Sequence, residues 1–226
     1  ERGIFNRQAC KDMAPSRRDT DHEFGTNPCS EIVLRSAQFC NLTEVVVRPE
    51  DNFETLKSKV GAATVLGTLQ SALTDFRFLR KVWKNNCDEE RLLGVSLTGI
   101  WDSEFFKAPR KGVESDKQST DDIRELKNHA IEVNKEWAEK LGINPSTAIT
   151  CVKPSGTVSQ LVNSASGCHP RHSAYYIRRV RNDVKDPLAK VMIDAGVPYE
   201  IDKFNKETYV FEFPMASPAT STTRHD

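Results

Sequence analysis

Strand-like and helix-like segments alternate along this chain of 226 residues, and the alternation limits the folds that the chain can adopt. The segments 51–76 and 119–141 carry apolar residues at the three- and four-residue spacing of a helix that buries one face. Short β-rich or apolar runs lie around them, at 39–47, 92–97 and 147–152. Because parallel strands are joined by long crossovers, usually helices, the pattern predicts an α/β barrel or sheet with parallel neighbours.

Local signals mark the ends of several expected elements. Asp51 can cap the first long helix, with Glu54 three residues later as its capping-box partner. Pro187 fits the first turn of a helix over 186–195, and Gly196 fits its end. The remaining expectations are a short helix at 77–85, a helical turn at 99–106, a polar loop at 112–119, a short helix after residue 155, and strands at 176–180 and 209–213.

Composition excludes several classes of protein. Lysine plus arginine equals aspartate plus glutamate, 32 of each, so no net charge favours binding to nucleic acid or to a membrane surface. We find no run of about 18 apolar residues and expect no membrane-spanning helix and no signal peptide. The six cysteines include no CxxC pair and are too sparse for a secreted disulfide scaffold. We therefore expect a cytoplasmic protein in which any disulfide is catalytic.

The segment 27–31, Asn-Pro-Cys-Ser-Glu, places a carboxamide, a thiol and a carboxylate beside a turn. A catalytic cysteine needs a base and a hydrogen-bond donor within reach, and a turn can bring such side chains together. In an extended turn, Cys29 and Glu31 would share a face because they are two residues apart. The alternative is structural, since Asn-Pro starts ordinary turns and cysteine is often buried as a small hydrophobe.

The segment 153–158, Lys-Pro-Ser-Gly-Thr-Val, lies between an expected strand and an expected helix. Backbone N–H groups at a helix start can bind an anion, and the hydroxyls of Ser155 and Thr157 add hydrogen-bond donors. Gly156 permits close approach of the anion to the backbone. The alternative is an ordinary strand–helix turn with a serine or threonine cap.

The segment 168–172, Cys-His-Pro-Arg-His, raises two other possibilities. Zinc needs three or four ligands, and the other histidines form no second cluster in the sequence, so we expect no metal site. A hydrolase dyad of Cys29 and His172 would leave Asn27, Cys40 and the anion-binding segment unexplained.

Three arginines, Arg178, Arg179 and Arg181, lie in an expected strand. Strand alternation places Arg179 and Arg181 on one face. We expect a solvated face or a domain contact there rather than a second phosphate site.

In their order along the chain, these motifs resemble the catalytic large chain of ribonucleotide reductase. They are 27–32 (Asn-Pro-Cys-Ser-Glu-Ile), 39–44 (Phe-Cys-Asn-Leu-Thr-Glu), 153–157 (Lys-Pro-Ser-Gly-Thr), 169–172 (His-Pro-Arg-His) and 175–181 (Tyr-Tyr-Ile-Arg-Arg-Val-Arg). The resemblance runs from about residue 3 to the last residue. The interval of eleven residues between Cys29 and Cys40 is most similar to that of the monomeric adenosylcobalamin-dependent branch.

The resemblance implies a fold and an activity. The fold is the ten-stranded α/β barrel with a cysteine-bearing finger loop, and residues 1–226 would be one domain, the C-terminal portion of that barrel within a longer chain. The activity is reduction of ribonucleotides to 2′-deoxyribonucleotides for DNA synthesis by a thiyl-radical mechanism.

The resemblance also implies roles for individual residues. Cys29 matches the radical cysteine that removes the hydrogen at C3′, and Glu31 matches the carboxylate that takes the proton of the 3′-hydroxyl. Asn27 matches a carboxamide that hydrogen-bonds the substrate hydroxyls. Cys40 matches one member of the reducing dithiol, whose partner lies upstream in the family. The substrate phosphates would be bound by the loop of Pro154, Ser155, Gly156, Thr157 and Val158.

The implied cofactor is adenosylcobalamin, held largely by parts outside this chain. The implied partners are a ribonucleoside di- or triphosphate substrate, a thioredoxin-type dithiol reductant, and a deoxynucleotide effector that acts through upstream regions. Two alternatives stay open at this point. One is the metal–oxygen-dependent (class I) reductase catalytic chain, and the other is a non-catalytic nucleotide-binding module.

Overall fold

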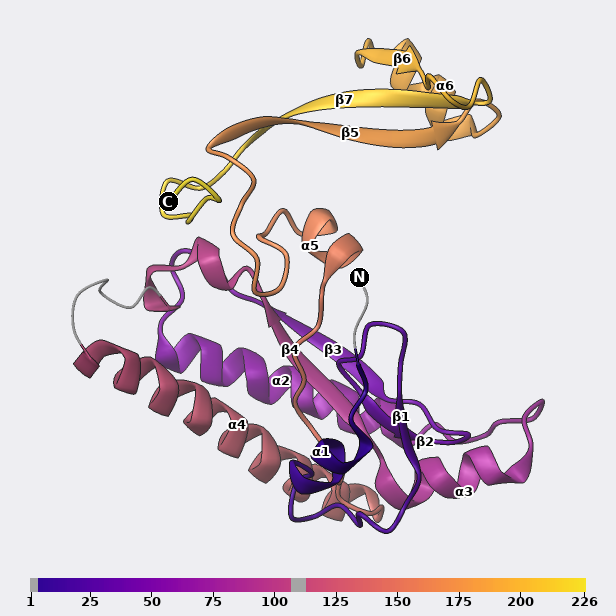
Figure 1. Cartoon of the computed structure of the whole chain (residues 1–226), viewed down its shortest axis with the longest axis vertical. Helices are drawn as coiled ribbons and strands as arrows, with labels where there is room; N and C mark the ends of the chain where they lie inside the picture. Colours follow the sequence, from indigo (N-terminus) through magenta and orange to yellow (C-terminus); the bar gives the residue numbers. More distant parts are fainter. Residues whose placement is uncertain (1–3, 107–112) are drawn as a thin grey trace. The chain divides into compact units, whose positions relative to one another are not determined.

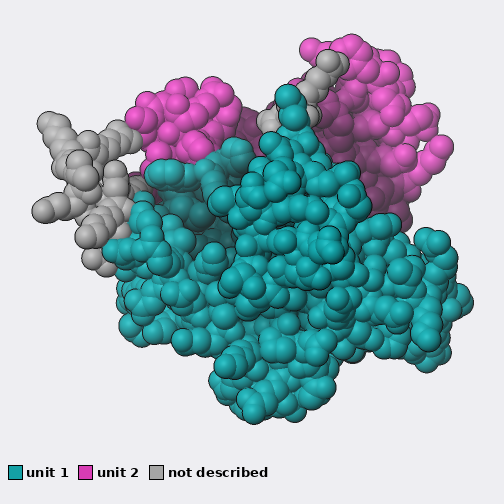
Figure 2. All heavy atoms as spheres, turned by 60° about the horizontal axis from the view of Figure 1, so that its bottom comes forward, with its two compact units in different colours: residues 1–169 teal, residues 170–226 magenta. Residues whose placement is uncertain are grey.

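Figure 1 shows the computed structural model of the chain, which describes residues 4–106 and 113–226, with backbone alone for 113–119. The chain divides into two compact units, Glu1–His169 and Pro170–Asp226 (Figure 2). The prediction that residues 1–226 form one domain of a longer barrel stays a prediction.

The first unit is built around a parallel pair of strands. Strand β3 (Asn41–Val46) pairs with β4 (Leu93–Thr98), so that Asn41 lies opposite Leu93 and Val46 opposite Thr98. The crossover between them contains helices α2 (Phe53–Ser71) and α3 (Lys81–Glu90). The other elements of this unit are α1 (Arg7–Asp12), β1 (Phe24–Thr26), β2 (Val33–Arg35), the 3-10 turns η1 (Ile100–Asp102) and η2 (Glu104–Phe106), α4 (Val113–Leu141) and α5 (Gly156–Leu161).

A third, irregular segment lies along the far edge of β4. The N–H of Leu93 donates to the carbonyl of Ala148 at 2.9 Å, and the N–H of Cys151 donates to the carbonyl of Val95 at 3.1 Å. Only one parallel bridge, Val95 to Thr150, forms here, so the strand expected at 147–152 is shorter and less regular than predicted. The parallel arrangement of the three segments agrees with the expected α/β fold.

Helices α2 and α4 lie side by side on one face of these strands (Figure 1). The core between helices and strands contains Val45 and Val47 from the strand side, Leu56 and Val60 from α2, and Leu126 from α4. The run of valines at 45–47 is therefore a buried strand end, as expected.

The second half of α2 departs from its expected packing. The helical spacing predicts that leucines continue the buried stripe to residue 76, but Leu66 and Leu69 are exposed, and Leu73, also exposed, lies beyond the end of the helix at Ser71. The buried positions are instead taken by small residues, namely Ala63, Thr64, Gly67, Thr68 and Ser71. A side chain at Gly67 would collide with Leu93 of β4, so small residues are what allow the helix to approach the strand closely.

The cap of α2 also differs from the expectation by one residue. Asn52, not Asp51, is the N-cap, and it forms a reciprocal capping box with Thr55. Asp51 instead accepts a hydrogen bond from the N–H of Arg48 at 2.7 Å and pairs with Lys59 at 2.5 Å. Asp51 therefore closes the turn before the helix.

Two further boundaries were wrong. Helix α4 begins at Val113, so residues 113–119 are helical rather than a polar loop, and Gly112 lies outside the described residues. Helix α3 spans Lys81–Glu90 rather than 77–85. The helical turn expected at 99–106 is present as two 3-10 turns. Among the residues that the structure describes, no helix is both long enough and apolar enough to cross a membrane.

The second unit is a three-stranded antiparallel sheet with one helix, and this departs from the expectation of parallel neighbours. The strand order is β5 (Tyr175–Asp183), β7 (Thr208–Ala216), β6 (Tyr199–Ile201). Helix α6 (Pro187–Asp194) begins with Asp186 as its cap and is followed by Gly196 at φ 77, as expected. Phe211 and Ala189 are fully buried within this unit.

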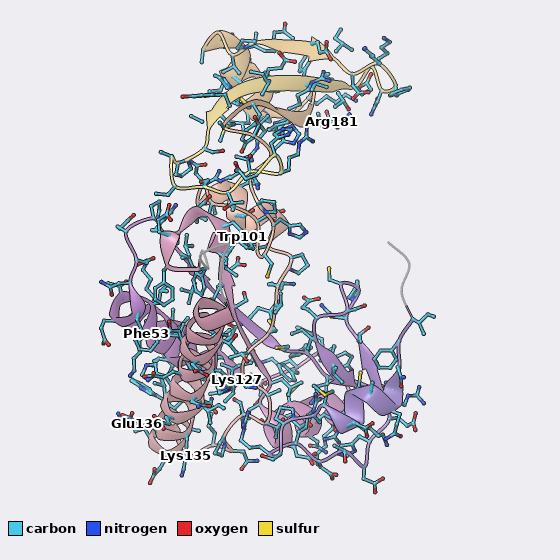
Figure 3. All side chains as sticks on the ribbon, turned by 60° about the vertical axis from the view of Figure 1, so that its left-hand side comes forward. Phe53, Trp101, Lys127, Lys135, Glu136 and Arg181 are labelled. Atoms are coloured by element: carbon cyan, nitrogen blue, oxygen red, sulfur yellow. The ribbon has the colours of Figure 1, made fainter. Side chains whose placement is uncertain are left out.

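The arginines of β5 form ion pairs across this sheet. Arg179 pairs with Glu200 and with Glu212, and Arg181 (labelled in Figure 3) pairs with Asp202 at 2.8 Å. Arg179 and Arg181 lie on one face, as alternation predicts. Each has an acidic partner, which favours a structural role over a phosphate site.

A buried ion pair connects the N-terminal part of the first unit to α3. The guanidinium of Arg18 donates to both carboxylate oxygens of Glu90, at 2.9 and 3.0 Å, and both side chains are only 3% exposed. Arg18 also donates to the carbonyl of Val33 in β2 at 2.8 Å and lies over the ring of Phe24 in β1. The carboxamide of Gln38 completes the group by donating to Glu90.

We expect Arg18→Met to lower the free energy of unfolding by about 3–5 kcal/mol, because it leaves the carboxylate of Glu90 buried without its cation. The double variant Arg18→Met/Glu90→Met should be less destabilised than Arg18→Met alone. Urea denaturation followed by circular dichroism measures both. Arg77→Met is the matched control, since Arg77 belongs to an exposed pair with Asp75 and should matter by less than about 1 kcal/mol. A change of that small size in Arg18→Met would contradict the argument.

Candidate active site

The thiol of Cys29 lies on the loop of the β1–β2 hairpin. The strands pair antiparallel, with Thr26 opposite Val33, and the loop spans 27–32. Asn27 closes this loop, because its side-chain oxygen accepts the N–H of Ile32 at 3.0 Å while its own N–H donates to the carbonyl of Ile32 at 3.2 Å. Ser30 at the tip adopts φ 65, a conformation uncommon for a residue other than glycine. A turn therefore presents the thiol, as the sequence predicts.

Cys29 and Glu31 differ in their exposure. The Cys29 residue is exposed, whereas the side chain of Glu31 is 5% exposed. The left-handed backbone of Ser30 interrupts the alternation that would place both on one face. Glu31 hydrogen-bonds Lys153, and this hydrogen bond is the main reason why the pKa of Lys153 is raised. Cys29 lies two residues before Glu31 on the same loop.

Lys153 is the direct partner of Glu31. Its ammonium donates to Glu31 Oε1 at 2.7 Å, and the lysine side chain is 27% exposed. Burial pulls the pKa of Glu31 upward, but the hydrogen bonds from Lys153 and Asn27 outweigh it and hold this pKa below its ordinary value. The carboxylate is therefore ionised at neutral pH, as a general base must be.

The thiols of Cys40 and Cys151 approach each other over Gly94 of β4. A Cβ placed at Gly94 would lie 3.1 Å from the sulfur of Cys151 and 3.2 Å from that of Cys40, and it would collide with Leu42. Burial raises the pKa of both thiols, to about 11 for Cys151, with smaller contributions from neighbouring negative charge. Glycine at position 94 is thus what allows two thiols to share this face of the strands.

Cys151 is not placed to be the disulfide partner of Cys40. Cys40 directly precedes β3, and Cys151 lies on the opposite side of β4. Strands are spaced by about 4.8 Å, so residues two strands apart lie beyond the about 7 Å between α-carbons that a disulfide can span. All six cysteines are free thiols in this structure.

The loop 154–158 has the geometry expected for a strand-to-helix connection. Helix α5 follows directly, and Ser155 precedes it with φ 53 and a buried hydroxyl. Among the described residues, this hydroxyl has no hydrogen-bond partner, whereas a serine acting as an ordinary cap would have one. Residues 156–158 are exposed.

The backbone around Lys153 is held by the segment after α5. Gly167, at φ 53, packs so closely that a Cβ there would lie 2.6 Å from the carbonyl oxygen of Lys153. The hydroxyl of Ser166 donates to the carbonyls of Pro154 and Ser155, at 2.8 and 3.0 Å. The N–H of Gly167 donates to the hydroxyl of Thr98 at 2.9 Å, at the end of β4. The strand end therefore positions Lys153 and the loop together.

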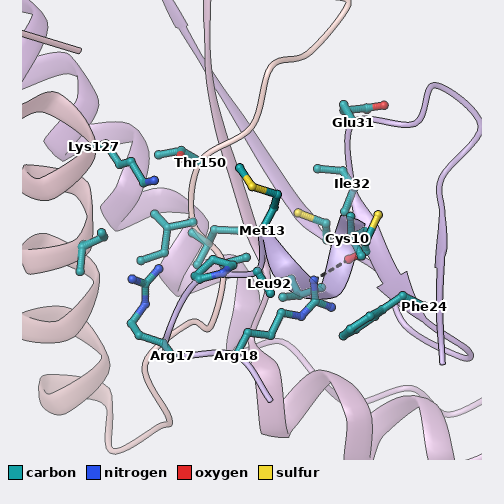
Figure 4. Close-up of a pocket in the computed structure, with 18 of the residues that line it drawn as sticks. Cys10, Met13, Arg17, Arg18, Phe24, Glu31, Ile32, Leu92, Lys127 and Thr150 are labelled. Carbon is teal, nitrogen blue, oxygen red and sulfur yellow. Dashed lines mark hydrogen bonds between the residues drawn. The ribbon is translucent and has the colours of Figure 1, made fainter. Parts of the chain in front are cut away.

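Glu31 and Cys40 line a cavity of about 450 Å³ (Figure 4). Arg18 and Phe24 of the buried ion-pair region line it too, as does Lys127 from α4. The predicted base and the predicted reducing thiol therefore line the same cavity.

The segment 168–172 takes no part in this cluster. Cys168 is exposed, and its carbonyl accepts the indole N–H of Trp101 at 2.7 Å (Trp101 is labelled in Figure 3). The ring of His172 contacts Tyr176 edge-on within the second unit. Among the side chains that the structure describes, in residues 4–106 and 120–226, no group of three or more histidine, cysteine, aspartate or glutamate residues is placed to hold a metal ion.

No family model matches the chain. An adenosylcobalamin-dependent ribonucleoside-triphosphate reductase of Lacticaseibacillus paracasei is 31% identical over 241 residues, covering 95% of this chain and 32% of the relative. The enzyme of the same name from Lactobacillus acidophilus is 34% identical over 217 residues, covering 87% of this chain and 28% of the relative.

A solved structure of a B12-dependent (class II) ribonucleotide reductase matches with a TM-score of 0.69 and 26% identity, over 90% of this chain and 31% of that chain. The chain is a relative of the ribonucleotide reductases. The resemblance inferred from the motifs is confirmed, as is the α/β fold. The chain spans about a third of the length of the curated relatives that it matches.

Sequence reasoning missed three residues of this reductase-like cluster, namely Lys153, Cys151 and Gly94. Lys153 belongs to the motif 153–157, but the sequence assigns no role to the lysine itself. Its position directly before the anion-binding loop was the one available signal. No local sequence pattern marks Cys151 or Gly94, because their proximity to Cys40 depends on which strands are neighbours in the fold.

We expect alkylation by iodoacetamide at pH 8 to modify Cys29 and Cys168 well before Cys151. The thiolate is the reactive form, and a pKa of about 11 leaves only about one Cys151 in a thousand ionised at that pH. The rate at Cys151 should rise about tenfold for each pH unit up to its pKa. Mass spectrometry of peptides after timed quenching measures each site. Equal rates at Cys151 and the exposed Cys168 would refute the burial argument.

Proposed function

We propose that the protein containing this chain reduces ribonucleotides to 2′-deoxyribonucleotides by a thiyl-radical mechanism. The observation that carries the proposal is the cluster itself. An exposed thiol on a hairpin loop lies near a buried ionised carboxylate, and a second thiol lines the same cavity as that carboxylate. The names of the relatives support the same reaction.

Cys29 acts as the radical residue. As a thiyl, it removes the hydrogen atom from C3′ of the substrate, so that the C3′–H bond breaks and the Cys29 S–H bond forms. The two bonds are similar in strength, which makes the step nearly reversible. Glu31 takes the proton of the 3′-hydroxyl, and Asn27 hydrogen-bonds the substrate hydroxyls with its carboxamide N–H₂ group, since its oxygen already closes the hairpin loop.

Cys40 supplies reducing equivalents. The 2′-hydroxyl leaves as water with a proton from a thiol, and two electrons come from Cys40 and a partner thiol that close to a disulfide. The hydrogen atom then returns from Cys29 to C3′, which restores the thiyl. Over one turnover, a ribonucleotide and a dithiol become a deoxyribonucleotide, water and a disulfide. A thioredoxin-type protein would reduce the disulfide.

The loop of Pro154, Ser155, Gly156, Thr157 and Val158 binds the substrate phosphates in this proposal. The unpartnered hydroxyl of Ser155 and the exposed backbone of 156–158 support that role. The printed names of the relatives favour a ribonucleoside triphosphate over a diphosphate.

Adenosylcobalamin, when bound, supplies the one-electron oxidant that generates the thiyl. The residues described here fit such a cofactor in one respect, since the Cys29 thiol is exposed on its loop and accessible to a group bound outside this chain. We assign no cofactor contact to this chain. The names of the relatives support this branch over the metal–oxygen-dependent one and over a non-catalytic nucleotide-binding module.

The whole protein would complete the ten-stranded barrel, with residues 1–226 as one part of its C-terminal portion and the β1–β2 loop as its finger loop. A deoxynucleotide effector would act through upstream regions. The free thiols fit a reducing compartment, and we place the reaction in the cytoplasm.

In the full-length protein, Cys29→Ser should reduce deoxynucleotide formation to the level of a control without enzyme. A hydroxyl O–H bond is too strong for its hydrogen to be returned and taken again by the substrate radical, so the cycle cannot run. Substrate binding should change by less than about 0.5 kcal/mol, because Cys29 is an exposed residue. The assay is deoxynucleotide formation with adenosylcobalamin, a ribonucleoside triphosphate and a dithiol. Multiple turnover by Cys29→Ser would exclude the thiyl assignment.

Cys40→Ser should behave differently, because it removes an electron source and leaves the initiating thiol in place. We expect loss of multiple turnover with thioredoxin while a substrate-derived radical still forms on rapid mixing, detectable by electron paramagnetic resonance. Cys168→Ser is the matched control and should keep wild-type turnover, since Cys168 lies outside the cluster. Normal turnover by Cys40→Ser would show that this thiol is only structural.

A further inference from the structure

The ammonium of Lys153 donates a hydrogen bond to Oε1 of Glu31 at 2.7 Å. The other oxygen, Oε2, is buried and has no hydrogen-bond partner among the described residues. Oε1 of Glu31 therefore has a hydrogen-bond donor, whereas Oε2 has none among the described residues. A buried acceptor without a partner is unfavourable by about 1–3 kcal/mol, so it is rarely left in place without a function.

We propose that Lys153 is a positioning residue for Glu31, holding Oε1 so that Oε2 is the oxygen that takes the proton of the substrate hydroxyl. The inference rests on the proposed function and deepens it. The proton passes from the hydroxyl oxygen to Oε2 and returns along the same path. Lys153 keeps its own proton throughout, so no further donor or acceptor is needed.

The backbone of Lys153 is fixed independently of its side chain. Gly167 packs against the carbonyl of Lys153, and Gly167 is itself held by the hydroxyl of Thr98 at the end of β4. The ammonium is a compact point charge on a flexible stem, so a fixed backbone limits the region that it can reach. The strand end therefore determines, through Gly167 and Lys153, which carboxylate oxygen is occupied.

The charges around Glu31 favour this arrangement. Lys153 is the cation that hydrogen-bonds Glu31, whereas the charge of Arg18 lowers the pKa of Cys40. Cys29, Cys40 and Cys151 are the other titratable groups whose interactions reach Glu31 or Lys153. Burial holds Cys40 and Cys151 protonated at neutral pH, so neither competes with Glu31 as an anion.

The hydrogen bond from Lys153 also lowers the pKa of Glu31. Without Lys153, the pKa of Glu31 would rise, because burial would be opposed only by the remaining hydrogen bonds. With Lys153 in place, the carboxylate stays ionised to lower pH. The lysine thus keeps the base in its active form over a wider pH range while leaving one oxygen free.

The test uses the full-length protein with Lys153→Met, Lys153→Arg and Lys57→Met. Lys153→Met removes the charge and keeps a similar side-chain length. Lys153→Arg keeps the charge. Lys57→Met is the matched control, because Lys57 pairs with Glu125 at 3.3 Å on the exposed surfaces of α2 and α4.

The first measurement is the pKa of Glu31 itself, by ¹³C NMR of protein labelled at the glutamate carboxyl, with the signal assigned by its loss in Glu31→Gln. We expect a wild-type value below about 4.3. In Lys153→Met we expect a rise of about one to three units, and in Lys153→Arg a value near that of the wild type. This measurement needs neither cofactor nor turnover. A wild-type value at or above about 4.3 overturns the proposal without any variant.

The second measurement is the pH profile of kcat/KM for deoxynucleotide formation. The acid limb reports the base in the free enzyme, so Lys153→Met should move this limb to higher pH by the same amount as the NMR value. A misplaced base should also lower kcat, by up to about 10²-fold. Lys153→Arg should restore most of the loss, and Lys57→Met should match the wild type.

The outcomes separate the two proposals. A wild-type protein that forms no deoxynucleotide, yet shows the NMR shift in Lys153→Met, refutes the proposed function and leaves the ion pair in place. An active wild type whose Lys153→Met variant keeps both the Glu31 pKa and the acid limb refutes the positioning role alone. A lower kcat in Lys153→Met with an unmoved acid limb also refutes it, because a purely structural role would give that result.

Discussion

The buried pair between Arg18 and Glu90 is the interaction on which the site depends most. Arg18 reaches the hairpin strand through the carbonyl of Val33, while the backbone carbonyl of Glu90 accepts the N–H of Thr147 at 2.9 Å. Glu90 at the end of α3 is therefore linked to the hairpin that carries Cys29 through Arg18, and directly to the segment that leads to Lys153. A bidentate guanidinium–carboxylate contact is directional, so it fixes orientation as well as distance.

The cluster that results combines groups from four parts of the chain. The hairpin contributes Cys29 and Glu31, the start of β3 contributes Cys40, β4 contributes the space at Gly94, and the irregular edge contributes Lys153. The electrostatic balance is local. A buried carboxylate stays ionised because one lysine offsets its desolvation, and buried thiols stay protonated because no cation compensates them equally.

Much of the first unit was predictable from local pattern. The two long helices, the valine-rich strand and the parallel arrangement followed from periodicity and from the length of the crossover. The errors have physical causes. The second half of α2 buries small residues because close packing against β4 leaves no room for leucine, and the cap moved to Asn52 because Asp51 closes the preceding turn. In the second unit, local pattern predicts the strands and the helix but not their antiparallel pairing, which depends on contacts between strands.

Residue type, order and spacing single out the candidate groups, namely the thiols, the carboxylate and the loop 154–158, whose roles stay predictions. The relatives confirm the family that those motifs resemble. Which of these groups meet depends on the tertiary structure. Lys153 and Glu31 are 122 residues apart in the sequence, yet their side chains form a hydrogen bond. Residue type and spacing are local properties, whereas the pairing of distant side chains depends on strand neighbours and buried ion pairs.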